Sequence, residues 1–202
     1  ELIERGGLHH PVIQAVRDRA VCLVNPFRCK ILYKKASLAV LSDERNEGLF
    51  DQEERQAIAD HIPWTRRVED RRTVIRRGDP PADLIPHVLA HQEHLVLKPN
   101  DDYGGKGIVL GWTVDTGTWE RAVQTALAEP YVVQERIRLP REPYPSMDEG
   151  RVVIHERMLD TAPFVVRGRA MEGCLTRISA DDLLNVTAGT GSAVPTLLVQ
   201  PR

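Results

Sequence analysis

A lysine followed by a glycine-rich stretch near the middle of the chain has the residue types that phosphate binding requires. Lys98 ends one apolar stretch and a second begins at Ile108, so the sequence predicts a β-hairpin. The connecting loop contains Tyr103, Gly104, Gly105, Lys106 and Gly107. Phosphates are bound by closely approaching backbone N–H groups and by cations, and this loop offers both. A glycine-rich turn beside a surface lysine is the structural alternative, because short glycine motifs are weak signals.

Two further groups of polar residues are candidates for a nucleotide site. Gln134 and Glu135 follow apolar residues in a predicted strand, which can present its backbone to an adenine edge and a carboxylate to a ribose. Arg177 lies near the end of another predicted strand, where a guanidinium can face a phosphate, and Asn185 precedes a Gly-Thr-Gly segment. Each group also has a purely structural explanation: an edge strand, a solvated arginine and a turn.

Hydrophobic periodicity indicates the elements that position these residues. Helices are expected at residues 12–19, 30–41, 53–61, 82–93 and 118–129. Strands are expected at residues 20–24, 95–98, 108–112, 131–137, 152–156, 164–167, 174–178 and 195–200. Asp51 and Glu54 have the spacing of a capping box, and the proline-rich residues 138–150 predict a loop. This order of elements predicts an α+β fold with two lobes and a cleft between them.

The composition excludes several classes of protein. The 202 residues include 27 Lys plus Arg and 29 Asp plus Glu, and the formal charge of −2 argues against a polybasic nucleic-acid binder. Hydrophobic residues make up 42% and charged residues 28%, as in ordinary globular domains. No apolar run approaches the roughly 18 residues of a membrane span. The three cysteines argue against a disulfide scaffold and predict a reducing compartment, the cytoplasm.

Paired arginines are a third candidate feature. They occur as Arg66-Arg67, Arg71-Arg72 and Arg76-Arg77. Such a stripe suits a nucleic-acid backbone, but the net charge and the lack of interleaved aromatic residues beyond Trp64 argue against that partner. We therefore expect a solvated, partly substrate-facing surface.

Three histidines have the spacing of one helix face. His87, His91 and His94 occupy positions i, i+4 and i+7, a pattern that suits zinc or nickel. No carboxylate or thiol ligand is paired with them in the sequence. An exposed helical face is therefore the favoured interpretation.

Taken in order, the motifs resemble those of the ATP-grasp family. The resemblance is carried by Lys98-Pro99, the glycine-rich hairpin, Gln134-Glu135, Phe164-Val-Val-Arg-Gly168, Arg177, Asn185 and Gly189-Thr-Gly191. The front of the chain is similar to the circularly permuted branch that contains glutathionylspermidine synthase-like proteins. That similarity rests on Val24-Asn25-Pro26-Phe27, Lys34-Lys35-Ala-Ser-Leu-Ala-Val-Leu41 and Ile62-Pro63-Trp64-Thr65-Arg66. The resemblance covers most of the chain.

The resemblance implies a fold in which two α+β lobes hold ATP. It implies that Lys35 and Lys98 lie near the ATP phosphates and that Gln134 and Glu135 lie at the adenine and ribose. A mobile flap over the phosphates would be formed by Tyr103, Gly104, Gly105, Lys106 and Gly107. The catalytic candidates facing the reacting phosphate are Arg177 and Asn185. The implied reaction is ATP-dependent ligation: a small-molecule or peptide carboxylate becomes an acyl phosphate, and an amine displaces the phosphate.

One departure from the family pattern concerns the metal. ATP-grasp ligases hold Mg²⁺ with an Asp or Glu and a Glu-x-Asn-type pair, and no such pair follows Asn185. In the permuted branch these ligands would precede Glu1, so the resemblance implies a chain truncated at its N-terminus. The alternative function is a catalytically inactive nucleotide-binding module.

The resemblance also implies a division of the chain into three segments. Residues 1–80 would be an α/β segment of the larger lobe, residues 81–137 the glycine-hairpin lobe, and residues 138–202 the antiparallel strands that complete the nucleotide cleft.

Overall fold

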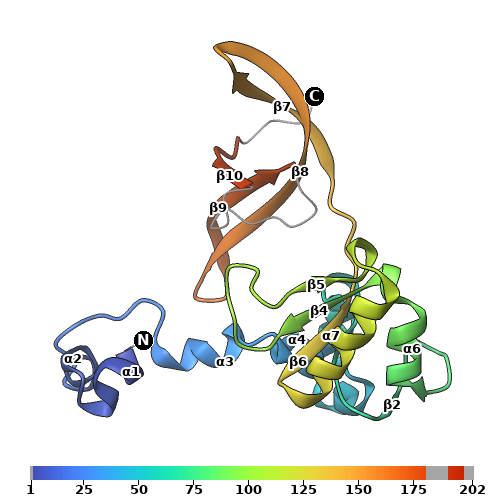
Figure 1. Cartoon of the computed structure of the whole chain (residues 1–202). Coiled ribbons are helices and arrows are strands. Elements are labelled where there is room, and N and C mark those ends of the chain that lie inside the picture. Colours follow the sequence, from blue (N-terminus) through green and yellow to red (C-terminus); the bar gives the residue numbers. More distant parts are fainter. Residues whose placement is uncertain (1, 181–190, 198–202) are drawn as a thin grey trace.

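Two four-stranded antiparallel sheets dominate the mixed α+β architecture (Figure 1). The computed structural model describes residues 2–180 and 191–197. The strands are β1 (Thr65–Arg67), β2 (Arg72–Thr73), β3 (Ala82–Asp83), β4 (Leu95–Pro99), β5 (Val109–Leu110), β6 (Tyr131–Glu135), β7 (Arg141–Asp148), β8 (Arg151–Val166), β9 (Ala170–Ser179) and β10 (Gly191–Val194). The α-helices are α1 (Leu2–Gly6), α2 (Pro11–Arg17), α3 (Lys30–Tyr33), α4 (Ala36–Ser42), α5 (Gln52–His61), α6 (Leu84–Ala90) and α7 (Thr116–Ala128).

The first sheet has the order β1-β6-β4-β5, and one of its faces carries the hydrophobic core. Directly paired residues of antiparallel strands share a face, so Leu97 and Val133 lie on the same side. They pack with Leu84 of α6 and with Trp119 and Val123 of α7, all of which are buried. The core therefore lies between this sheet and helices α6 and α7.

The opposite face of the first sheet is polar near its centre. Thr65 of β1 pairs with Gln134 of β6, and Lys98 of β4 is the diagonal neighbour of Gln134 on the same face. Helix α4 extends from the β4–β5 loop to β1, because its N-terminal end contacts Asn100 and its C-terminal Ser42 is hydrogen-bonded to Thr65. Polar groups are thus gathered on the face that α6 and α7 do not cover.

The second sheet has the order β10-β9-β8-β7 and extends away from the first in Figure 1. One continuous strand, β8, replaces the two strands expected at 152–156 and 164–167. The expected loop at 138–150 is wrong, because β7 pairs with β8 along its whole length. β7 tolerates Pro143 and Pro145 because it is the edge strand and needs hydrogen bonds on one side alone. Residues 195–197 of the last expected strand are not in a strand.

Several local predictions are confirmed. Strands β4 and β6 and helix α7 occur within one or two residues of the expected bounds. Helix α5 begins with the predicted capping box, in which the Asp51 side chain accepts from the Glu54 N–H and the Glu54 carboxylate accepts from the Asp51 N–H. The hairpin around the glycine-rich loop also forms, with β4 and β5 antiparallel.

Other predicted elements are wrong in extent. Residues 20–24 form no strand. The helix expected at 30–41 is interrupted at Lys34, whose backbone is extended. The helix expected at 82–93 begins two residues later, after β3, and ends at Ala90. In the second and third cases contacts with distant residues replace the local pattern: Lys35 and Ala36 bind Asn100, and β3 pairs with β2.

The first sheet crosses the boundary expected between residues 80 and 81. β1 pairs with β6, so residues 65–67 and 131–135 belong to one sheet. Val68 also lies in the same hydrophobic core as Leu84 and Val88. The segments before and after residue 80 therefore fold around a common core.

Candidate functional site

All five lysines of the chain lie on or beside the loop that joins β4 to β5. This loop, residues 100–108, is called the glycine loop below. Lys30 and Lys34 form ion pairs with this loop, and Lys35 donates to its backbone. Lys98 lies near the end of the strand that enters the loop, and Lys106 belongs to the loop. These five residues are called the lysine cluster below. The basic residues elsewhere in the chain are all arginines.

The first half of the glycine loop is tied to the segment between α3 and α4. The Lys35 N–H donates to the Asn100 carbonyl oxygen at 3.1 Å, and the Ala36 N–H donates to the Asn100 side-chain oxygen at 2.9 Å. Lys35 Nζ donates to the Asp102 carbonyl oxygen at 2.8 Å. The break between α3 and α4 is what turns these donors toward the loop.

Asp101 holds two lysines at the same loop. Its carboxylate lies 2.5 Å from Lys30 Nζ and forms a second ion pair with Lys34 Nζ. Hydrogen bonds from Lys30 and Lys34 lower the pKa of Asp101 to about 2. Both ion pairs are partly exposed, so each of them contributes little to folding stability.

Lys98 is held at the polar face of the first sheet. Its Nζ donates to the Gln134 Oε1 at 2.7 Å, and the Gln134 Nε2 donates in turn to the Thr65 Oγ1 at 2.8 Å. Burial lowers the pKa of Lys98, and the charge of Lys35 nearby lowers it further. Lys35 and Lys98, far apart in sequence, both adjoin the start of the glycine loop, because Lys35 contacts Asn100 and Asp102 and β4 leads from Lys98 into Asn100.

The glycines give the loop a conformation that other residues rarely adopt. Gly104, Gly105 and Gly107 have φ angles of 68°, 78° and 66°, in the left-handed region. A Cβ atom at Gly107 would lie 2.8 Å from the Tyr131 hydroxyl oxygen and 3.2 Å from the Pro99 Cγ. Gly107 is therefore required both by backbone angle and by close packing at the base of the loop.

The predicted adenine and ribose residues do not point the same way. Gln134 is buried on the polar face, where it contacts Lys98 and Thr65. Glu135 follows it in the strand and therefore projects from the other face. Its Oε1 accepts from the Trp64 backbone N–H at 2.7 Å. Gln134 thus belongs with the lysine cluster, whereas Glu135 fixes the approach of the chain to β1.

Comparison with known proteins assigns no family to this chain. No protein-family model matches it, and neither does any curated protein.

Arg177, a predicted catalytic residue, is paired within the second sheet. It is the direct cross-strand partner of Asp160, and its Nε donates to the Asp160 Oδ1 at 2.9 Å, with a second contact from Nη2 to Oδ2. Asp160 raises the pKa of Arg177. Its described contacts do not join it to the lysine cluster. The other predicted catalytic residue, Asn185, lies outside the described residues.

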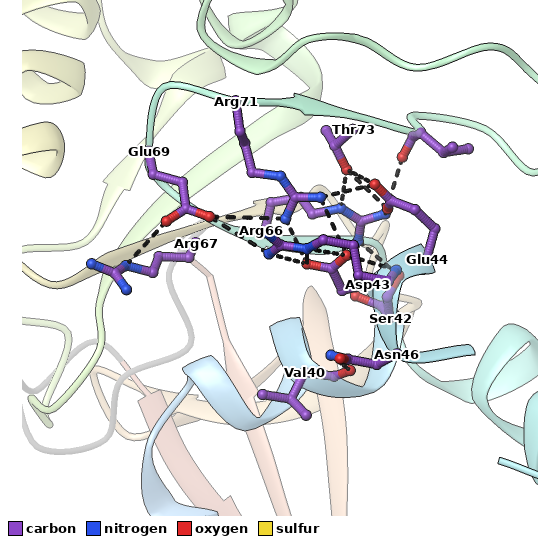
Figure 2. A network of polar contacts seen from close by, with 12 residues as sticks. Val40, Ser42, Asp43, Glu44, Asn46, Arg66, Arg67, Glu69, Arg71 and Thr73 are labelled. Carbon is purple, nitrogen blue, oxygen red and sulfur yellow. Dashed lines mark hydrogen bonds and ion pairs between the residues drawn. The ribbon is translucent and has the colours of Figure 1, made fainter. Parts of the chain in front are cut away.

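The paired arginines are solvated in part, as the sequence predicted: Arg67, Arg72, Arg76 and Arg77 are exposed, whereas Arg66 and Arg71 are held inside the molecule. Figure 2 shows Arg66 and Arg71 meeting Asp43 and Glu44 in a dense polar network. Arg66 is 2% exposed and contacts Glu44 at 2.8 Å and the Thr73 hydroxyl at 2.6 Å. The network connects the end of α4 to β1 and β2. Its arginines are structural, because each is already neutralised inside the molecule.

Asp43 is the most strongly held acid of this network. Burial alone would raise its pKa, but hydrogen bonds from Arg71 and Arg45 hold the pKa well below its usual range. The Arg71 Nη1 lies 2.5 Å from the Asp43 Oδ2. Asp43 is therefore ionised wherever the protein is folded at ordinary pH.

The three histidines do not share one helix face. Helix α6 ends at Ala90, so His91 lies at its C-terminal cap and His94 in the following turn. The His87 and His91 rings stack with centroids 4.2 Å apart. Within residues 2–180 and 191–197, no group of three or more His, Cys, Asp or Glu side chains is placed to hold a metal ion. The same ranges contain no helix that is both long and apolar enough to cross a membrane.

The sequence reasoning missed Lys30, Lys34, Asp101 and Thr65. The uneven use of lysine was the available signal for the first two, because lysines occur at residues 30–35 and 98–106 alone. Thr65 carried no signal, since its role depends on the pairing of β1 with β6.

Proposed function

We propose that this chain is the nucleotide-binding portion of an ATP-dependent carboxylate–amine ligase. The reaction would activate a carboxylate of a small molecule or peptide as an acyl phosphate, which an amine then attacks. The resemblance to the circularly permuted ATP-grasp branch, noted from the sequence, motivates this choice of reaction. The assignment to the cytoplasm rests on the cysteine content alone.

The observation that carries the proposal is the convergence of Lys35 and Lys98 at the glycine loop. Lys98 stands on a rigid strand, where Gln134 fixes its ammonium group. Lys35 comes from a separate segment and is oriented by the Asp102 carbonyl. Two partly desolvated ammonium groups repel each other, and an anion placed between them removes that repulsion. A polyphosphate is the ligand that such a pair fits.

Each part of the site then has a defined role. The ammonium groups of Lys35 and Lys98 neutralise phosphate oxygens, and this effect strengthens as the site is desolvated. The glycine loop, with its left-handed backbone, approaches the phosphates closely and excludes water from a reactive acyl phosphate. Gln134 keeps the Lys98 ammonium group aligned through its hydrogen bond.

Mg²⁺ is not accounted for by the described residues. The acids nearest the lysines are Asp101 and Asp102, and the Asp101 carboxylate is already paired with Lys30 and Lys34. Because no described donor set fits the ion, no step of the reaction is assigned to it.

Isothermal titration of ATP, with and without Mg²⁺, tests nucleotide binding directly. Wild-type protein should give a saturable heat, and Lys98→Ala should weaken the affinity at least about tenfold. Arg121→Ala is the matched control, because Arg121 is an exposed cation of α7, the helix on the other face of the sheet, and this variant should bind as wild type. If wild-type protein gives no saturable heat, the proposal fails.

A nucleotide-binding module without turnover is the second candidate. It is favoured by the engagement of Asp101, an acid beside the lysines, whose carboxylate is paired with Lys30 and Lys34. Phosphate release in the presence of Mg²⁺, ATP and a panel of acids and amines separates the two. Saturable ATP binding with no phosphate release in any combination would support the module over the ligase.

A further inference from the structure

We infer that the lysine cluster is a polyphosphate site that the chain partly blocks with its own Asp101, so that the ligand must displace this carboxylate to reach Lys30 and Lys34. The inference rests on the proposed nucleotide function and adds two binding residues and a competing internal anion. It is carried by the contacts at Asp101 and by the distribution of lysine in the chain.

The first step concerns which cations gather here. The chain has 27 Lys and Arg residues, of which five are lysines, and all five lie on or beside the glycine loop. Elsewhere, as in the Arg66–Glu44 pair, internal carboxylates are held by arginine. Arginine suits fixed, bidentate pairs, whereas lysine is a flexible point charge that can exchange one anion for another. The lysines therefore mark a place where the anionic partner changes.

The second step concerns Asp101 itself. One carboxylate bridges two ammonium groups, with Oδ1 on Lys30 and Oδ2 on Lys34. Two oxygens of one phosphate can make the same pair of contacts. Asp101 thus occupies a position where an anionic ligand oxygen can bind. It lies on the glycine loop, so exchanging it also releases the loop from Lys30 and Lys34.

The third step concerns continuity. Lys35 Nζ donates to the Asp102 carbonyl oxygen, and the neighbouring Asp101 pairs with Lys30 and Lys34. Lys98 lies near the end of the strand that enters the same loop, and the charge of Lys35 acts on it. A chain of phosphates can contact several of these cations at once, whereas a single phosphate reaches fewer of them. The ligand class is a nucleoside triphosphate or another linear polyphosphate.

The experiment is a titration of ATP and of inorganic tripolyphosphate into the wild type, Asp101→Asn and the Lys30→Gln/Lys34→Gln double variant. Asp70→Asn is the control for net charge, since Asp70 is an exposed acid outside the loop. Asp101→Asn should tighten tripolyphosphate binding about threefold to tenfold. Asp70→Asn should stay within about twofold of wild type, and the double variant should bind at least about tenfold more weakly.

A double-mutant cycle separates competition from simple support of the loop. If Asp101 competes with the ligand for Lys30 and Lys34, Asp101→Asn should lose most of its effect in the Lys30→Gln/Lys34→Gln background. Weaker binding in Asp101→Asn would overturn the inference, because it would mean that Asp101 holds the loop in its binding conformation. An unchanged effect in the double-variant background would overturn it as well.

The two probes keep this inference apart from the proposed function. Binding of tripolyphosphate without binding of ATP would contradict the proposed nucleotide function and support the anion site. Binding of ATP that is insensitive to Asp101→Asn would support the proposed function and contradict the competition by Asp101.

Discussion

Arg66 and Arg67 are adjacent in β1, yet the side chain of Arg66 is 2% exposed and that of Arg67 is 71% exposed. Successive residues of a strand project to opposite faces, so one guanidinium enters the network with Glu44 and Thr73 and the other enters solvent. The same residue type thus has two different roles at neighbouring positions.

This difference predicts unequal effects of substitution on stability. Arg66→Met should lower the free energy of unfolding by about 2–4 kcal/mol, because it removes the buried cation and leaves Glu44 and Thr73 short of a partner. Arg67→Met, the control, should change it by less than about 0.5 kcal/mol. Urea unfolding followed by circular dichroism measures both. Equal losses for the two variants would contradict the structural role of Arg66.

Two glycines of the loop should also differ. Gly104→Ala should lower the free energy of unfolding by about 1 kcal/mol, because alanine disfavours the left-handed backbone. No further cost is expected, since nothing lies within 4 Å of the added Cβ. Gly107→Ala adds contacts of 2.8 Å with the Tyr131 hydroxyl and 3.2 Å with Pro99. Gly107→Ala should therefore lower the free energy of unfolding, measured by heat or urea, by about 1 kcal/mol or more beyond the effect of Gly104→Ala. Similar losses would show that Tyr131 moves aside without cost.

The charge at residue 134 should control nucleotide affinity. Gln134→Glu places a carboxylate beside the Lys98 ammonium and neutralises it, so the affinity for ATP should fall about tenfold or more. Gln124→Glu on the exposed side of α7 adds the same charge far from the site and is the control. Titration calorimetry of the two variants tests this prediction. Equal affinities for ATP would show that Lys98 does not take part in nucleotide binding.

The lowered pKa of Lys98 predicts a pH dependence of binding. Burial and Lys35 disfavour its charged form, so the ammonium loses its proton below the ordinary lysine value of 10.5. As the pH rises through this lowered pKa, the site loses positive charge and the affinity for ATP should fall. Binding isotherms between about pH 7 and about pH 10 measure the change. Lys98→Arg should reduce this pH dependence without abolishing it, because arginine stays protonated whereas burial also lowers the pKa of Lys35.

Some of this architecture could be predicted from the sequence because it depends on neighbouring residues. The capping box of α5 is a contact between residues three apart, and the glycine loop is bounded by two short apolar stretches that pair directly. Alternation along β6 also implies that Gln134 and Glu135 face opposite sides, although their adjacency first suggested one site. β7 could not be predicted, because Pro143 and Pro145 are tolerated only where the sheet order makes that strand an edge.

The sequence by itself determined the local pieces: the strand that carries Lys98, the glycines that follow it and, within two residues of its bounds, the helix α7. The tertiary structure alone decided which charges meet. Lys30, Lys34 and Lys35 reach the loop across more than sixty residues of chain, and Arg66 reaches Glu44 through the pairing of β1 and the turn after α4. Local propensity acts over one turn of helix or one hairpin, whereas the environment of a charge is set by whatever the fold packs against it.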